Sequence, residues 1–260
     1  MSDLILTSKE VQELEKRAFA EGVSQEDLMD LAGRGIGRKI LQVETIPGTC
    51  LIYLGKGNNA GDTIVAASLL QQSGWSVIAR MVGPEEDLDL LPKKKWSALG
   101  KPFRLISAVP ERLIGNRPII VLDGLLGLGA RPGLSDRYRR FTAEINRLRE
   151  RWNTRTYAID IPTGLSDSAV DPDTVIADAT LTVGFPKSCL FLDAAVNMVG
   201  SIWIIDLDAL TERAPTDKTR PRLAVSSALY HLVHRRPFDS HKGNFGRIGI
   251  IAGSRGFIGA

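Results

Sequence analysis

The chain has 260 residues, of which 43% are hydrophobic and 24% charged, and its formal net charge is +3. This composition excludes wholesale disorder, and so small a net charge excludes a dedicated nucleic-acid-binding protein. No apolar run reaches the length of a membrane span and no signal peptide opens the chain, so we expect a cytoplasmic protein that does not contact membranes. Cys50 and Cys189 lie far apart in apolar stretches, which predicts buried free thiols in a reducing compartment.

The N-terminal part of the chain predicts two amphipathic helices. Thr7 or Ser8 can cap the first one, and Ser24 with Asp27 can start a second that runs to about Gln42. Apolar residues recur at helical spacing in both segments, so each should bury one face.

After these helices, candidate strands alternate with candidate helices. The predicted strands are Cys50–Leu54, Ser76–Val82, Phe103–Ile106, Ile119–Gly124 and Thr156–Ile161. The predicted helices are Asp62–Ser73, Asp89–Leu99, Pro110–Ile114 and Asp136–Arg151. Two later apolar runs, Ala179–Phe185 and Ser201–Ile205, should extend the sheet near one edge. This alternation predicts an α/β fold: a Rossmann-like three-layer α/β/α sandwich with a mostly parallel sheet.

A glycine- and asparagine-rich loop, Gly55-Lys-Gly-Asn-Asn-Ala-Gly-Asp62, separates the first predicted strand from the helix after it. Such a loop can bring backbone N–H groups and a helix N-terminus close to an anion. The oxygens of Asn58, Asn59 and Asp62 suit a hard cation or ribose hydroxyls. The loop is not a Walker A motif and departs from the G-x-G-x-x-G pattern, and an ordinary glycine-rich turn is the alternative.

Two further motifs, within Val121–Gly129 and Ala158–Leu165, also lie at the ends of predicted strands. The first continues the chain after Leu122 and the second after Ile159, just as the glycine loop follows Leu54. Ligands of open α/β sheets bind beyond the carboxyl ends of the strands. The three stretches should therefore converge on one crevice.

The three stretches together resemble a known family. Gly55–Asp62 is similar to the G-x-G-N-N-G-G-D loop of NAD(P)H-hydrate epimerases, the YjeF N-terminal family. Val121–Gly129 is similar to its V-D-A-x-x-G-x-G segment, and Ala158–Leu165 to its A-x-D-I-P-S-G-x segment. The resemblance covers roughly residues 1–210. It implies an isomerase that interconverts the R and S forms of hydrated NADH and NADPH (NADHX and NADPHX) in nicotinamide nucleotide repair.

Asp160 and Lys187 are the candidate proton-exchanging residues. A carboxylate at an apolar strand end is unfavourable unless it has a partner, and general acid–base chemistry needs such a positioned group. A lysine can exchange protons at neutral pH only if burial lowers its pKa. The resemblance implies that the substrate contacts Asp160 and the two glycine-rich loops, that is, Asn58, Asn59, Ala60, Gly61, Asp62, Gly127, Leu128, Gly129, Ala130, Arg131, Pro132 and Gly133.

The resemblance also implies one potassium ion per subunit, held by Asn59, Asp123 and Thr163. Amide, carboxylate and hydroxyl oxygens suit a hard cation rather than zinc. Thr163 stands where the family has serine, and it keeps the hydroxyl oxygen.

Ala60 and Thr63 depart from glycines of the family loop. If Ala60 needed a positive φ, its Cβ would impose strain of about 1 kcal/mol. These departures leave an alternative function open, a non-catalytic nucleotide-binding or protein-interaction module on the same fold. The sequence also leaves open whether the chain forms a homo-oligomer.

The C-terminal part changes in composition. Residues 211–222 are polar, contain Pro215 and Pro221, and predict a linker. Residues 223–260, with a predicted helix at Ala224–Val233 and a predicted strand at Ile248–Ala252, resemble the opening of the ADP/ATP-dependent NAD(P)H-hydrate dehydratase domain, which is ribokinase-like. We expect residues 223–260 to be an incomplete start of that domain, so that dehydratase activity and its ADP or ATP belong only to a longer bifunctional chain.

Overall fold

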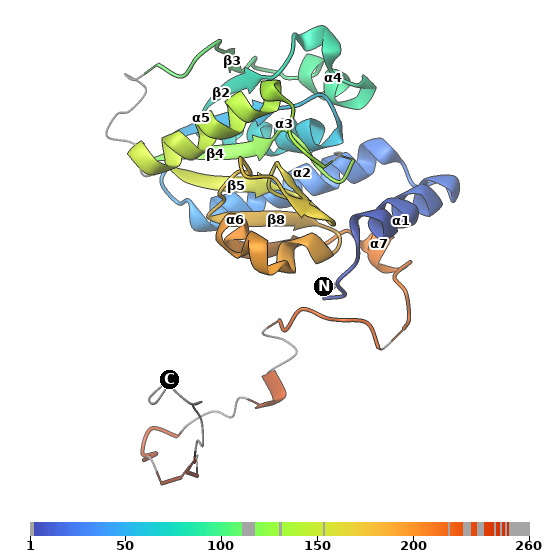
Figure 1. Cartoon of the computed structure of the whole chain (residues 1–260), viewed down its shortest axis with the longest axis vertical. Helices are drawn as coiled ribbons and strands as arrows, with labels where there is room; N and C mark the ends of the chain where they lie inside the picture. Colours follow the sequence, from blue (N-terminus) through green and yellow to red (C-terminus); the bar gives the residue numbers. More distant parts are fainter. Residues whose placement is uncertain are drawn as a thin grey trace. The chain divides into compact units, whose positions relative to one another are not determined.

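The computed structural model describes residues 3–110, 118–129, 132–152, 154–217 and 219–225, and beyond them 230–232, 237–241, 243–244, 246–247 and 249. The chain divides into two units, Met1–Leu223 and Ala224–Ala260 (Figure 1). In the second unit the structure describes a short 3-10 helix, Tyr230–Leu232. Most of the predicted strand Ile248–Ala252, half of the predicted helix Ala224–Val233 and most of the predicted helix Pro110–Ile114 lie outside the described residues.

A parallel seven-stranded sheet in the order β3-β2-β1-β4-β5-β8-β9 forms the centre of the first unit. Its strands are β1 Thr49–Leu54, β2 Ser76–Met81, β3 Arg104–Leu105, β4 Ile119–Gly124, β5 Arg155–Ile159, β8 Ala179–Val183 and β9 Ser201–Ile205. A two-stranded antiparallel ribbon, β6 Leu165–Ser166 and β7 Ala169–Val170, lies outside this sheet. The order confirms the Rossmann-like fold, with β8 and β9 as the predicted extension at one edge.

The strand order reverses between β1 and β4. From β1 the chain runs outward through β2 to β3, and it then returns to place β4 on the other side of β1. The loops after β1 and β4 therefore leave the sheet in opposite directions. A crevice forms at such a reversal in doubly wound sheets.

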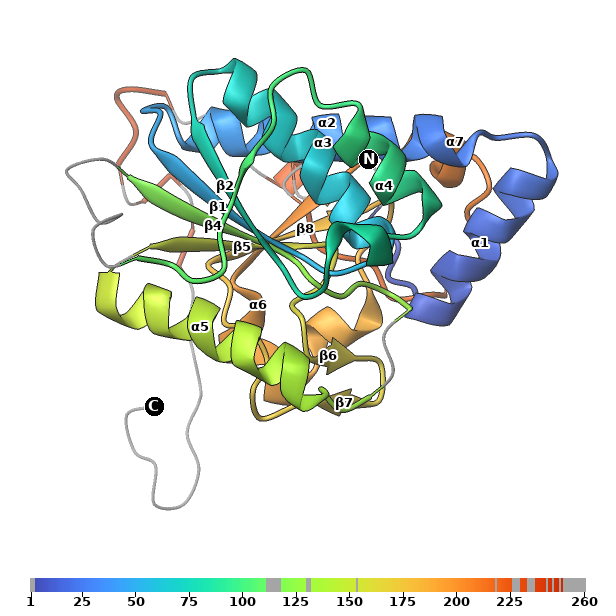
Figure 2. The same ribbon diagram turned by 90° about the horizontal axis from the view of Figure 1, so that it is seen from above.

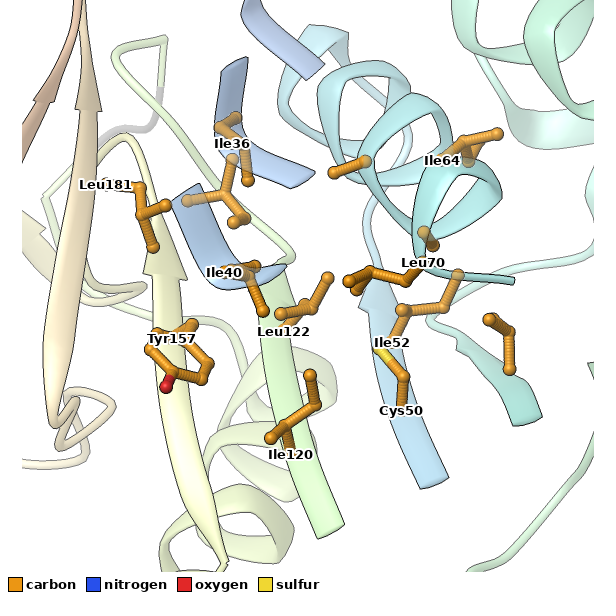
Figure 3. Close-up of a cluster of buried hydrophobic side chains, with 14 of the residues drawn as sticks. Ile36, Ile40, Cys50, Ile52, Ile64, Leu70, Ile120, Leu122, Tyr157 and Leu181 are labelled. Atoms are coloured by element: carbon orange, nitrogen blue, oxygen red, sulfur yellow. The ribbon is translucent and has the colours of Figure 1, made fainter. Parts of the chain in front are cut away.

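Helices cover both faces of the sheet (Figure 2). The longer ones are α2 Gln25–Val43, α3 Asn58–Gln72, α4 Leu90–Ser97 and α5 Asp136–Trp152; α6 is Val196–Val199, and 3-10 turns occupy Glu85–Asp87, Ser188–Phe191 and Asp193–Ala195. Ile52 and Leu122 face α2 and α3 in one cluster (Figure 3). Leu51 and Val121, one residue earlier on each strand, pack with Ile145 of α5 in another cluster. Since successive strand residues point to opposite faces, both faces are apolar and both are covered.

The N-terminal segment and helix α1, Ser8–Ala20, lie beside the carboxyl end of the sheet (Figure 2). Thr7 caps this helix, because its hydroxyl accepts from the Glu10 N–H while the Glu10 carboxylate accepts from the Thr7 N–H. Val11 and Leu14 pack in a cluster that includes Leu210 of helix α7, Asp208–Thr211. The helix is therefore fixed against the sheet rather than projecting from it.

Helix α3 begins earlier than the sequence predicted. Asn58, Ala60 and Asp62, expected in a loop that led into a helix from Asp62, are already helical. Asparagine and glycine are weak helix formers, so local preference favours a loop here. Tertiary packing overrides it: a Cβ on Gly61 would lie only 2.4 Å from Met29 Sδ, which shows how closely this turn packs on α2.

Two other sequence-based expectations can be compared with the described residues. Cys50 and Cys189 are both buried and free, as predicted. In the described part of the chain, no helix is both long and apolar enough to span a bilayer.

The C-terminal end of the predicted linker, residues 211–222, pairs with the N-terminal segment. Ile5 N donates to Pro221 O at 3.0 Å and Leu223 N donates to Asp3 O at 2.7 Å. Arg220 and Arg222 form ion pairs with Glu10 and Asp3. The polar, proline-containing composition of residues 211–222 predicted a linker, because composition carries no information on backbone pairing with a distant segment.

This pairing predicts where the chain can be shortened. A chain that ends at Leu223 should have the same melting temperature as the first unit of the full 260-residue chain. A chain ending at Thr211 loses backbone hydrogen bonds and ion pairs worth about 2 kcal/mol together, so its melting temperature should fall by about 5 °C. Thermal melts of the two shortened chains make the comparison, and equal melting temperatures would contradict it.

Candidate functional site

A pocket of about 400 Å³ lies at the switch point of the sheet. The loops after β1 and β4 line it, together with the residue after β5, the first turns of α3 and one side of α1. These are the three stretches that the sequence predicted to converge. Asp160 and Lys187 both line this pocket.

Lys187 is completely buried and pairs with Asp160, which is 7% exposed. Its Nζ donates to Asp160 Oδ1 and, at 2.6 Å, to the carbonyl of Val183. The main chain on either side of Lys187 is fixed by Leu6: Leu6 N donates to Pro186 O at 3.0 Å and Ser188 N donates to Leu6 O at 2.8 Å. The N-terminal segment therefore holds this lysine in place.

Asp160 has a φ of 68°, the only positive value among the described residues other than glycine. Aspartate tolerates the left-handed region better than most side chains, but the conformation still costs about 1 kcal/mol. Its own N–H donates to Leu181 O at 2.8 Å, and its Oδ1 accepts from Val183 N at 3.2 Å. Contacts with β8 thus hold a strained residue whose carboxylate lines the pocket.

Three more carboxyl groups line the pocket: Asp62 from α3, Glu15 from α1 and Asp89, which is exposed. Removal from water raises the pKa of Glu15 to about 7, and repulsion by Asp160 adds to the effect while Lys187 opposes it. The pKa of Asp62 is raised for the same reasons, with Glu15 as a further repelling charge. The pocket therefore contains carboxyl groups that can carry a proton near neutral pH.

The N-terminus of α3 opens toward the same pocket. Gly57 is its N-cap, and glycine has no side chain that could accept from the first N–H groups of the helix. Ala60 N returns to Gly57 O at 2.9 Å. Gly55 brings the loop against the chain after β4, since a Cβ there would lie 1.8 Å from Leu125 O. Unsatisfied N–H groups at a helix N-terminus favour an anion such as a phosphate.

Asn59, Asp123 and Thr163 lie together around the backbone of Leu126. Asn59 Nδ2 donates to Leu126 O at 2.9 Å, and Leu126 N donates to Thr163 Oγ1 at 3.1 Å. Thr163 Oγ1 and N in turn donate to the carboxylate of Asp123 at 2.7 and 2.8 Å. Among the residues that the structure describes, Asn59 Oδ1 is buried without a hydrogen-bond partner. Burial raises the pKa of Asp123 to about 6, against the effect of the Thr163 hydrogen bonds.

Most residues predicted to contact substrate line this pocket: Asn58, Asn59, Asp62, Gly127, Leu128, Gly129 and Asp160. Pro132 lies instead in a neighbouring pocket with Gly127 and Leu128. Ala60, Gly61 and Gly133 do not line the main pocket, and Ala130 and Arg131 lie outside the described residues. Because this stretch is helical rather than a loop, Ala60 is buried in the hydrophobic core and Gly61 packs against Met29 of α2.

The two departures from the family loop, Ala60 and Thr63, are packing residues. Both are fully buried. Ala60 is helical and has no positive φ, so the expected strain is absent. Thr63 donates its hydroxyl to Asn59 O at 2.7 Å and packs against Gly124. Neither side chain lines the pocket. The two substitutions on which the non-catalytic alternative rested therefore do not change the pocket lining.

The sequence reasoning missed Glu15 and Gln12 of α1. Both line the pocket, and Gln12 Nε2 donates to Leu128 O at 3.1 Å. A signal was present in the sequence: Glu15 follows Val11 by one helical turn, on the margin of the face that Val11 and Ala18 bury. An acidic residue at the margin of an amphipathic helix is also typical of a solvated face, so the spacing by itself does not place Glu15 in a pocket.

The fold and pocket define a doubly wound α/β protein with a nucleotide-sized site at its switch point. The family described as YjeF-related protein N-terminus matches residues 25–189, so the chain belongs to this family. The crystal structure of yeast ynu0 has the same fold, with a TM-score of 0.60 and 16% identity over 71% of this chain and 82% of that chain.

Curated relatives carry the name NAD(P)H-hydrate epimerase or bifunctional NAD(P)H-hydrate repair enzyme. The epimerase of Rhodopirellula baltica is 33% identical over 69% of this chain and 74% of its own length. The bifunctional enzymes Nnr of Coxiella burnetii and Methanopyrus kandleri are 29% and 31% identical over 99% of this chain, and over 52% and 50% of their own lengths. The chain thus spans about half the length of these bifunctional relatives.

The buried Asp160–Lys187 pair predicts a strong stability effect. Replacing Lys187 by Met fills a similar volume but leaves the Asp160 carboxylate buried without its cation. The loss should be about 3–5 kcal/mol, because breaking a buried pair strands a charge. Adding Asp160→Asn should recover at least half of the loss, since asparagine is neutral and tolerates a positive φ. Urea unfolding of both variants tests this; a loss below about 1 kcal/mol for K187M would contradict it.

Proposed function

We propose that the chain is an NAD(P)H-hydrate epimerase that interconverts the R and S forms of NADHX and NADPHX. The observation that carries this proposal is the pocket at the switch point, where the Asp160–Lys187 pair lies beside an uncapped helix N-terminus. A hydrated dinucleotide needs both an anion site for its pyrophosphate and proton-exchanging groups for its ring. Family membership and the names of the relatives support the same substrate. The free thiols support the cytoplasm as its place of action.

The pyrophosphate binds, in this proposal, where α3 begins. The helix N-terminus supplies N–H groups and a partial positive charge there. Lys56, exposed in the loop just before it, adds a full positive charge and also lines the pocket. The backbone of Gly127–Gly129 faces the same space and offers further hydrogen bonds.

The chemistry takes place at the hydroxyl-bearing carbon of the reduced ring. Water adds to the double bond of an enamine at the carbon bonded to nitrogen, so this carbon carries the hydroxyl. Inversion there proceeds by loss and return of the hydroxyl group, which requires one group that gives a proton and one that takes it. Asp160 has one oxygen, Oδ1, committed to Lys187 and Val183, and its second oxygen is the candidate proton acceptor.

Potassium fits the cluster of Asn59, Asp123 and Thr163. Among the described residues the buried Asn59 Oδ1 has no hydrogen-bond partner and can therefore ligate a cation, and the other ligand atoms would be carboxylate and hydroxyl oxygens. Among the described residues no group of His, Cys, Asp and Glu side chains forms a transition-metal site. A bound cation would supply positive charge beside the nucleotide.

The second unit, in this proposal, corresponds to the beginning of the dehydratase part of bifunctional relatives. Support comes from the alignments: the Coxiella burnetii enzyme aligns with 99% of this chain, whereas the Rhodopirellula baltica epimerase aligns with 69%. Dehydration, with ADP or ATP, belongs to the remaining length of those relatives.

The proposed function is tested by supplying the pure R hydrate of NADH or NADPH and following both epimers by chromatography. The chain should bring them to equilibrium much faster than they interconvert spontaneously. A rate equal to that of the buffer alone would refute the proposal.

Asp160→Asn should lower turnover by about 100-fold or more, because the amide keeps the shape and the φ of the residue but cannot accept a proton. The substrate KM should change little, since the pyrophosphate contacts lie elsewhere. Asp178→Asn, which removes a carboxylate that pairs with Arg149 away from the pocket, is the matched control. Steady-state kinetics with the R hydrate measure both variants, and full activity of D160N would exclude Asp160 as the proton acceptor.

Potassium should stabilise the chain more than sodium does. At a salt concentration about 100-fold above the dissociation constant, the melting temperature should rise by about 5 °C. Asn59→Ala and Thr163→Val each remove one oxygen and should abolish most of this difference. Thr180→Val removes another buried hydroxyl, one that donates to Val199 O, and should leave the difference intact. Melts in KCl and NaCl at equal ionic strength decide; an undiminished potassium effect in both site variants would place the ion elsewhere.

A further inference from the structure

Glu15 is the one carboxyl group that helix α1 contributes to the pocket. Val11 and Leu14 beside it are 1% exposed, so the helix is packed and Glu15 has little freedom to turn away. Its carboxyl forms no hydrogen bond or ion pair with the described residues. It is thus an uncommitted acid held inside the pocket.

Asp160 and Lys187 differ from Glu15 in this respect. Lys187 donates to Asp160 and to the Val183 carbonyl, and Asp160 Oδ1 also accepts from Val183 N. This network uses most of the hydrogen-bonding capacity of the lysine and one oxygen of the aspartate. A group that gives its proton to the substrate must have an O–H or N–H that is not already donated to another protein atom.

The charges around Glu15 favour its protonated form. Burial is the largest cause, Asp160 just after β5 repels the negative charge of Glu15, and Lys187, already paired with Asp160, offsets part of this. Asp62 lines the same pocket from α3, and its own pKa is raised well above the ordinary value, with Glu15 among the repelling charges. Lys56 and Asp89 line the same pocket but are exposed to solvent. Burial and this repulsion raise the pKa of Glu15 to about 7, so near neutral pH a large fraction of the molecules carry the proton.

We propose that Glu15 is the general acid of the epimerase, the residue that protonates the departing hydroxyl group of the hydrated ring. The inference rests on the proposed function and adds to it a catalytic residue from a different part of the fold. Glu15, from helix α1, would donate the proton, and Asp160, the residue after strand β5, would accept one.

The steps balance without any redox change. Glu15 gives its proton to the hydroxyl oxygen, the carbon–oxygen bond breaks with its electron pair on oxygen, and water leaves. The ring nitrogen's lone pair stabilises the resulting cation. Water then adds to the other face, and the free oxygen of Asp160 takes its proton. That proton passes back to Glu15 through pocket water, and in the reverse direction the two groups exchange roles.

The test compares Glu15→Gln with the wild type in the R-hydrate assay. E15Q should lose about 100-fold in kcat with little change in KM, because the amide retains the shape but cannot donate as an acid. Glu15→Asp keeps a carboxyl group and should recover at least about tenfold over E15Q. Glu13→Gln, an exposed position on the same helix, is the matched control and should retain wild-type activity.

The pH profile separates an acid from a merely structural residue. A required acid is active below its pKa, so wild-type kcat/KM, which reports groups of the free enzyme, should fall as the pH rises through about 7, the pKa of Glu15. In E15Q this fall should be absent. ¹³C NMR titration of the Glu15 carboxyl in the wild type, assigned through its side-chain and backbone correlations, should give a midpoint near 7, and this measurement does not require the variant to be stable.

Three results would overturn the inference. One is an E15Q enzyme with near wild-type kcat, another an unchanged pH profile in that variant, and the third a Glu15 carboxyl titrating near its ordinary value of 4.5. If E15Q is active while the wild type epimerises the hydrate, only the inference fails. If the wild type itself does not epimerise the hydrate, the proposed function fails and the inference with it.

Discussion

The buried pair of Asp160 and Lys187 is the interaction on which the rest of the site depends. A fully buried lysine is tolerated only because its ammonium has a carboxylate and a carbonyl to donate to. Satisfying it requires Asp160 in a left-handed conformation, the end of β8 at Val183 and the N-terminal segment at Leu6. Three distant parts of the chain are thereby fixed around one pair. Burial is the main cause of the raised pKa of Glu15, and the charge of Asp160 adds to it.

The sheet order brings this pair next to the loops that follow β1 and β4. β1 and β4 are parallel neighbours, but the chain after β1 continues toward β2 and the chain after β4 continues toward β5. The loops that follow the two strands therefore separate and leave a crevice. Gly55 allows those two loops to touch at the base, and Gly57 leaves the helix N-terminus without a side-chain cap. The same pocket thus contains the glycine-capped start of α3, which we propose binds the pyrophosphate, and the carboxyl groups that we propose exchange protons.

The alternation of apolar runs was sufficient to predict the parallel sheet and its edge extension, because strands buried on both faces have a clear hydrophobic signature. The convergence of the three motifs also followed, since parallel strands end at one edge. The start of α3 was not predictable, because its Asn- and Gly-rich first turn is held helical by contact with Met29. Glu15 and the pairing of Pro221 with Ile5 were missed for a related reason: both depend on how distant segments pack, which local sequence patterns do not report.

The most direct test of this account is a crystal structure of the chain with hydrated NADPH. The account predicts the pyrophosphate at the first turn of α3 and the hydroxyl-bearing ring within hydrogen-bonding distance of Asp160 and Glu15. A nucleotide bound instead in the neighbouring pocket of about 290 Å³ beside Gly83, Arg137 and Tyr138, with its ring far from Asp160, would contradict it.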